Sequence, residues 1–229
     1  NLWLATSAGV QLFDYKSNCF TNYVTVVKGV KQEVSSFKQI AEDREKRLWA
    51  LGANGLYLID QKNKTVNHHS EQDQILALHQ TAGGTIYLGE ATNGLRYFQK
   101  DSVIKSVKVP IKGSGTRVNS IIEWTDNSNQ NWLCIAVNGG FVLKNLKNNV
   151  VKEYVANELN PSSLNAFNIF HLAKDRQNRL WLSTDNGISI IDPNYQNFEN
   201  IAVYQQVNLS NPKLLGIPNN MLETADRFY

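Results

Sequence analysis

The sequence predicts an all-β fold in which one four-stranded unit is repeated five times. Three observations predict it: an aromatic anchor recurs at regular intervals, a tight turn follows each anchor, and short apolar strands flank both. The anchors stand 46, 38, 45 and 49 residues apart, and they are Trp3, Trp49, Tyr87, Trp132 and Trp181. A repeat of this length with four strands is the signature of a β-propeller blade.

Each unit begins with a strand and a polar turn that lead into the anchor strand. The expected first strands are 37–41, 75–79, 120–124 and 169–173. An acid recurs in the turn, at Asp43, Asp126 and Asp175. We explain it by the turn that it closes, since Asp side chains bond nearby backbone amides. An anchor that is needed once in every unit indicates packing between sheets and not sugar stacking.

A tight turn and two further strands complete each unit. Most of these turns contain Asn-Gly, as at Asn54-Gly55 and Asn186-Gly187. Asn-Gly between apolar strands indicates a hairpin, because both residues accept positive φ. The sequence thus predicts almost no helix and five sheets. The five repeats cover approximately residues 1–23 plus 219–229, 34–70, 74–109, 117–155 and 165–205.

The two ends of the chain predict how the units are joined. The chain begins at the second strand of a unit, and residues 219–229 resemble a further first strand. Pairing residues 219–229 with 2–6 would hide two sheet edges that otherwise promote association. The sequence therefore favours a closed five-bladed ring in a single domain, residues 1–229. The alternative is an open arc of a larger, seven-bladed ring. Either way, we expect a fragment of a larger protein.

Composition and motifs argue against several classes of function. The net charge of +3 is too small and too scattered for a nucleic-acid surface. No apolar run approaches the length of a membrane span, and no signal peptide is evident. The two cysteines, Cys19 and Cys134, make no disulfide framework and are interpreted as packing residues. We predict no metal, because the four histidines are scattered and the adjacent His68 and His69 point to opposite faces of a strand.

No nucleophile elbow, P-loop or dinucleotide fingerprint is present, so we predict no catalytic residue and no cofactor. Positions that break the repeat are better candidates for ligand contact. First-strand starts and second-to-third-strand turns share one face of a propeller. The predicted ligand-binding residues lie at these positions, and they are Asn54, Asn93, Arg117, Asn119, Asn138, Asn165, Phe167, Asn168 and Asp185. Amide and guanidinium groups beside an aromatic ring suit a neutral or acidic sugar; the alternative is a solvated rim without a ligand.

The fifth unit resembles the two-component regulator propeller repeat. The resemblance is carried by Asp175, residues 178–184, residues 186–188, Asp192 and Phe198. The second unit matches nearly as well, through residues 42–43, 47–49, 54–56 and Asp60, and the tail 215–229 resembles the segment that joins two late blades of that family. The third and fourth units depart from the pattern, with Tyr87 in place of Trp and Asn131-Trp132 in place of Leu-Trp.

This resemblance implies the extracytoplasmic input region of a membrane-bound bacterial signalling protein. The output of such proteins is a histidine kinase, a hybrid kinase with a DNA-binding domain or a diguanylate cyclase, and many members in gut Bacteroidetes sense oligosaccharides. We therefore expect a periplasmic, non-enzymatic sensor of an oligosaccharide or another small molecule, attached to the inner membrane through flanking segments. The alternative is a protein–protein interaction scaffold, such as a homodimer, without a small ligand. A propeller lyase is disfavoured because no convergent acid–base set is seen.

Overall fold

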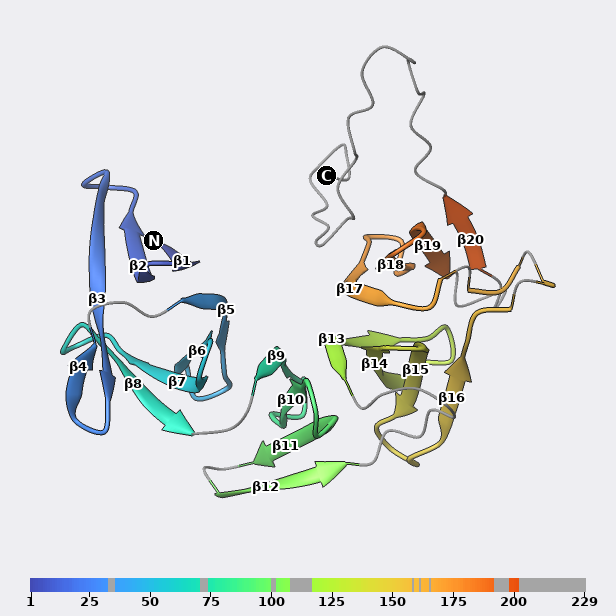
Figure 1. The fold of residues 1–229 in the computed structure, drawn as a ribbon, viewed down its shortest axis with the longest axis horizontal. Coiled ribbons are helices and arrows are strands. Elements are labelled where there is room, and N and C mark those ends of the chain that lie inside the picture. Colours follow the sequence, from blue (N-terminus) through green and yellow to red (C-terminus); the bar gives the residue numbers. More distant parts are fainter. Residues whose placement is uncertain are drawn as a thin grey trace, which may run out of the picture. The chain divides into compact units, whose positions relative to one another are not determined.

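The computed structural model describes residues 1–32, 36–70, 74–99, 102–107, 117–157, 159–160, 162–164, 166–191 and 198–201. Every regular element within them is a β-strand, which confirms the all-β prediction. The chain divides into two compact units, Asn1–Val107 and Lys108–Tyr229. Each unit is described by itself (Figure 1).

The first unit contains the strands of the first three repeats. Its larger sheet has the order β1-β2-β3-β8-β7-β6-β5, with β4 paired to β3. The strands of this sheet are β1 (Leu2–Thr6), β2 (Gly9–Asp14), β3 (Cys19–Val27), β4 (Val30–Gln32), β5 (Phe37–Glu42), β6 (Leu48–Gly52), β7 (Gly55–Asp60) and β8 (Thr65–Ser70). We call β1–β3 blade one and β5–β8 blade two. Blade three is a four-stranded sheet of β9 (Ile75–Gln80), β10 (Ile86–Glu90), β11 (Leu95–Gln99) and β12 (Ser102–Val107).

The second unit contains two four-stranded antiparallel sheets. Blade four consists of β13 (Val118–Thr125), β14 (Asn131–Val137), β15 (Gly140–Asn145) and β16 (Val151–Tyr154). Blade five consists of β17 (Ile169–Lys174), β18 (Leu180–Thr184), β19 (Gly187–Ile191) and β20 (Phe198–Ile201). In both, the strands follow one another in sequence order, which is the meander expected of a propeller blade.

Blades one and two share a sheet, so the prediction of five separate sheets is wrong at this point. Strand β3 is nine residues long, and only its first half pairs with β2. Its second half runs parallel to β8, with Val24 opposite Thr65, and continues into the hairpin with β4. The extra length of β3 leaves backbone donors and acceptors beyond the end of β2, and the edge of β8 satisfies them (Figure 1).

Apolar clusters lie between successive blades, which explains why each unit needs a large aromatic anchor. Blades one and two share one cluster, blades two and three a second, and blades four and five a third. All four anchor Trp side chains are expected to be buried, and Trp49 and Trp132 are, as is Tyr87. The expectation is wrong for Trp3 and Trp181, which are only half-buried and belong to the first and last of the described blades.

The tight turns of blades two and five lie one residue earlier in the sequence than their Asn-Gly pairs indicate. Gly55 and Gly187 have positive φ, 128° and 102°, whereas the preceding Asn54 and Asn186 do not. The register shows why, because Gly52 pairs with Gly55 and Thr184 with Gly187. The two-residue turn therefore lies one residue earlier than expected, and the glycine alone adopts the conformation that side chains disfavour.

Ring closure remains a prediction, because residues 219–229 lie outside the described residues. Among the described strands, β1 pairs with β2 only. The number of blades and the single-domain boundary likewise stay predictions.

Candidate functional site

A turn clasp holds the entrance to the anchor strand in blades two and five. We define it as an Asp, the Arg four residues later and the Trp six residues later. In blade five, Asp175 Oδ1 accepts the backbone N–H of Arg179 at 2.8 Å, and its Oδ2 accepts Arg179 Nε at 2.7 Å and Trp181 Nε1 at 2.8 Å. The guanidinium carbon also lies 5.6 Å from the centre of the Trp181 ring. The recurring acid therefore closes the turn, as predicted, and also fixes the anchor.

Blade two repeats this clasp with nearly the same geometry. Asp43 accepts the backbone N–H of Arg47 at 2.8 Å, Arg47 Nε at 2.6 Å and Trp49 Nε1 at 2.8 Å. Burial by itself raises the pKa of Asp43, but the hydrogen bonds from Trp49 and Arg47 and the arginine charge hold the pKa below its ordinary value of 3.8. The pKa of Asp175 is lowered by the same balance. Both carboxylates are thus ionised structural acceptors.

Blades three and four depart from the clasp in different ways. Blade three has Thr81, Thr85 and Tyr87 at the three positions, so the longer Thr81 hydroxyl contacts replace those of the carboxylate beside the backbone bonds of the turn. Blade four keeps the acid and the anchor, as Asp126 and Trp132, but has Gln130 in place of arginine. At these positions the residues are not needed for the clasp, so they are candidates for another role.

The opposite end of blades four and five brings together six of the predicted ligand-binding residues. Arg117 and Asn119 lie at the start of β13, and Asn138 lies in the turn after β14. From the last blade, Phe167 and Asn168 precede β17, and Asp185 lies in the turn after β18. We call these six residues the amide rim. The expectation that first-strand starts and second-to-third-strand turns share one end of the blades is thus met in this unit.

Side-chain hydrogen bonds join five residues of the amide rim in two groups. Arg117 Nε donates to Asn119 Oδ1 at 2.9 Å, and Asn119 Nδ2 donates to Asn138 Oδ1 at 3.1 Å. Asn168 Nδ2 donates to Asp185 Oδ2 at 2.8 Å. Backbone bonds support the network, since the Asn138 and Asn168 segments form an isolated antiparallel bridge.

The amide rim also ties the two blades to each other. Asn119 Nδ2 reaches the backbone oxygen of Ile169 in blade five at 2.8 Å. Close by, the backbone N–H of Gly139 donates to the carbonyl of Phe167 at 2.8 Å. A molecule that bound at the rim would therefore contact both blades, and it could alter how they pack.

The exposed part of the amide rim offers groups that suit a polyhydroxylated ligand. Arg117 and Asp185 are exposed, and Phe167 exposes 57% of its surface. Asn119, Asn138 and Asn168 are half-buried, and hydrogen bonds within the rim hold their side chains in place. A guanidinium, a carboxylate and amides beside an exposed ring can donate to, accept from and stack on a sugar.

The other predicted residues are not part of this network as described. Asn54 and Asn93 are exposed in the first unit, where His68 Nε2 lies 3.1 Å from the Asn54 carbonyl oxygen. Asn165 lies outside the described residues.

The adjacent His68 and His69 contact different rings, Tyr57 and Trp49, as expected of opposite strand faces. Among the described residues, no three His, Cys, Asp or Glu side chains gather as a metal site.

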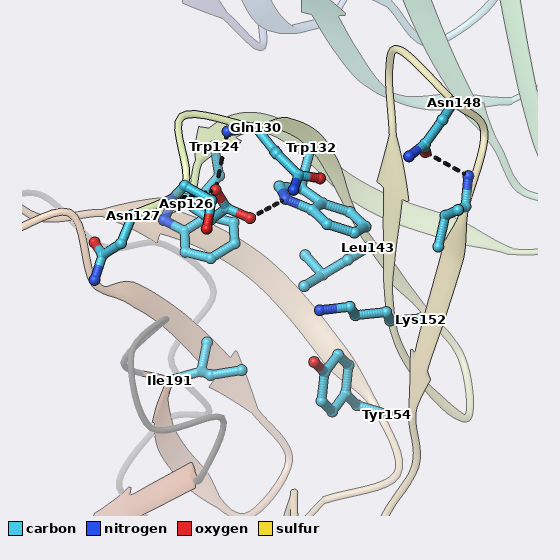
Figure 2. A pocket seen from close by; sticks show the side chains of 12 residues that line it. Trp124, Asp126, Asn127, Gln130, Trp132, Leu143, Asn148, Lys152, Tyr154 and Ile191 are labelled. Atoms are coloured by element: carbon cyan, nitrogen blue, oxygen red, sulfur yellow. Dashed lines mark hydrogen bonds between the residues drawn. The ribbon is translucent and has the colours of Figure 1, made fainter.

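Sequence reasoning missed a cavity in blade four, at the end of β13 remote from the amide rim. Its volume is about 470 Å³, and Trp124, Trp132 and Tyr154 line it together with Asp126 and Lys152 (Figure 2). The signal that could have found it is the replacement of the clasp arginine by Gln130.

No helix in the described part of the chain is long and apolar enough to cross a membrane.

A comparison with protein-family models matches one of the repeats. Residues 163–186, which include the clasp of blade five, match the family model of the two component regulator propeller. The chain is therefore similar to this family over residues 163–186. A comparison with curated proteins gives no match.

Solved structures share the fold across most of the chain. The extracellular domain of the hybrid two component system BT3049 from B. thetaiotaomicron is 22% identical, with a TM-score of 0.68, and the match covers 96% of this chain and 29% of that one. The corresponding domain of BT4673 from the same organism is 19% identical, with a TM-score of 0.65, over 82% of this chain and 25% of that one.

PorZ, a surface component of the type-IX secretion system of Porphyromonas gingivalis, is 13% identical, with a TM-score of 0.61, over 96% of this chain and 34% of that one. The chain thus spans between a quarter and about a third of the length of these three structures. At these identities the similarity establishes the propeller fold.

Proposed function

We propose that this chain is part of the extracytoplasmic sensor region of a bacterial two-component signalling protein, and that the amide rim binds its ligand. The ligand class is an oligosaccharide or another small polar molecule. The observation that carries the proposal is the amide rim, in which six of the predicted residues meet at one end of two blades and are joined by side-chain and backbone hydrogen bonds. The repeat at residues 163–186 and the fold shared with two extracellular domains support the cellular setting.

The rim supports binding and not catalysis. Its one carboxylate, Asp185, is exposed and accepts a hydrogen bond from Asn168, so no second acid or base faces it in the rim. Because Asn119 bonds across the two blades, a bound ligand could change how firmly the blades pack. Such a change in packing is a physical route from ligand binding to a signal.

A glycan array on the complete extracytoplasmic region tests the proposal, followed by calorimetric titration of any hit. Arg117→Ala and Phe167→Ala remove exposed rim groups, and we expect each to weaken binding at least about tenfold without changing thermal stability. Lys147→Ala and Tyr15→Ala are matched controls, because both residues are exposed and lie outside the rim. Equal loss of binding in the controls, or none in the rim variants, would contradict the proposal.

One observation favours the alternative of a protein–protein interaction scaffold. Leu2, Phe13 and Phe20 are directly opposite one another across β1, β2 and β3, and Phe20 is 60% exposed. Such an apolar row suits contact with another protein surface. Light scattering of the protein and of Phe20→Ser distinguishes the two: a concentration-dependent dimer that the substitution abolishes would favour the scaffold.

A further inference from the structure

Blade four contains a cavity next to an incomplete turn clasp. Gln130, which lines the cavity of about 470 Å³, stands at the sequence position of Arg47 and Arg179. In blades two and five the guanidinium lies within 5.3 and 5.6 Å of the anchor ring centre. Blade four has no guanidinium at this place, and the cavity opens beside its anchor, Trp132 (Figure 2).

The acid of the incomplete clasp keeps an unused acceptor site. Asp126 Oδ1 accepts the backbone N–H groups of Ser128 and Gln130, both at 2.9 Å. Its Oδ2 accepts Trp132 Nε1 at 2.8 Å and, among the described residues, nothing else. The same oxygen of Asp43 and Asp175 accepts an arginine Nε in addition. The cavity therefore lacks one N–H donor that the sister blades supply.

An opposite charge enters the cavity from another strand. Lys152 projects from β16, and its Nζ lies 4.9 Å from the centre of the Trp132 ring (Figure 2). Within the described residues Lys152 and Asp126 form no direct ion pair, although the lysine charge contributes to lowering the pKa of Asp126 against the effect of burial. The cavity thus presents an anion and a cation, and the rings of Trp124 and Tyr154 also line it.

We propose that this cavity binds a small molecule that carries both a guanidinium and a carboxylate group, such as free arginine. The guanidinium donates to Asp126 Oδ2, as the arginines of blades two and five do from within the chain. The carboxylate pairs with the Lys152 ammonium, and the hydrocarbon stem packs against the aromatic walls. The volume lies within the range of small-molecule sites. A ligand with both charges suits a partly buried site with both charges, because neither is left unpaired.

This site is independent of the amide rim and of the proposed function. Arg117 and Asn119 lie at the start of β13, whereas Trp124 and Asp126 lie at its end. The two sites are therefore at opposite ends of the same strand, and failure of one does not entail failure of the other.

Isothermal titration of the full chain with L-arginine tests the proposal. We expect L-arginine to bind. We expect citrulline, which has a neutral ureido group in place of the guanidinium, and agmatine, which lacks the carboxylate, to bind at least about tenfold more weakly. Glycyl-arginine carries both groups at a peptide end, so equal binding assigns the site to peptide ends and weaker binding assigns it to the free amino acid. Absence of arginine binding at millimolar concentration overturns the proposal, and so does equal binding of citrulline.

Two variants locate the binding. Gln130→Arg supplies the missing guanidinium from the chain, and we expect it to abolish arginine binding while the fold is kept. Gln177→Arg is the matched control, because Gln177 is exposed in the corresponding turn of blade five and does not line the cavity. We expect this control to bind as the unchanged protein does.

Lys152→Gln is a second variant. Unlike Gln130→Arg, it adds no side chain that could occupy the cavity. We expect it to weaken arginine about tenfold and to leave agmatine unchanged, since only arginine has the carboxylate. Arginine binding that survives Gln130→Arg, or that is lost in Arg117→Ala at the rim, overturns the assignment to this cavity.

Discussion

Blades four and five have the same turn and the same anchor, but they use them differently. In blade five, Asp175 binds both Arg179 and Trp181, and the clasp is complete. In blade four, Asp126 binds Trp132 in the same way, but Gln130 leaves one acceptor unused and a cavity beside the ring. The comparison teaches that the acid and the anchor are enough to build a blade. The arginine is therefore an added restraint, and where Gln130 replaces it a cavity lies beside the anchor.

Removing the acid of the complete clasp should have the largest effect. Asp175→Ala leaves the Trp181 N–H and the Arg179 guanidinium without their shared acceptor, and we expect it to lower the free energy of unfolding by about 3 kcal/mol. Asp126→Ala lacks the arginine contribution and should cost about 1 kcal/mol less. Urea denaturation followed by tryptophan fluorescence measures both. Equal losses would show that the arginine adds nothing to the clasp.

The complete clasp should also make blade five sensitive to acid. The pKa of Asp175 is held below 3.8 despite burial, so the folded state binds its proton less readily than the unfolded state. This stability is fully present above pH 3.8 and is lost as the pH falls through the lowered folded-state pKa. We therefore expect the stability difference between the protein and Asp175→Asn to be constant near pH 7 and to shrink below pH 3.8. A difference that does not change with pH would contradict this mechanism.

Completing the clasp of blade four should have a smaller, stabilising effect. Gln130→Arg adds a charge-assisted bond to Asp126, partly offset by repulsion from Lys152, and we expect a gain of about 0.5 kcal/mol. The midpoint of thermal unfolding measures it, with Gln177→Arg as the control for added charge. A loss of stability greater than that in the control would mean that the cavity does not accommodate the arginine side chain.

The two cysteines should differ in how fast they react with a thiol reagent, and this prediction involves no change in stability. Cys134 is fully buried in blade four, where burial raises the pKa of its thiol well above the ordinary value, whereas Cys19 is exposed in blade one. We expect a maleimide at pH 7.5 to label Cys19 within minutes and Cys134 only after unfolding. Mass spectrometry of the labelled peptides checks this, and rapid labelling of Cys134 would show that blade four opens readily.

Much of the candidate site could be predicted from the sequence, because its signals are local. Arg117, Asn119 and Asn168 stand at strand starts that depart from the repeat, and the ends of strands in neighbouring blades necessarily meet. Their hydrogen-bond partners could not be predicted in the same way. Asn119 bonds to the carbonyl of Ile169, fifty residues away, and only the packed register of two blades selects that partner.

The sequence by itself determined the repeat, the strand order within each blade and the role of the recurring acid, because alternation and turn chemistry act over a few residues. Tertiary structure alone decided three features: the parallel pairing of β3 with β8, the bond from the anchor Trp to its Asp in blades two, four and five, and the cavity beside Trp132. The substitution of arginine by Gln130 is visible in the sequence. Its consequence is not, because a cavity exists only where side chains from several strands pack around a group that is missing.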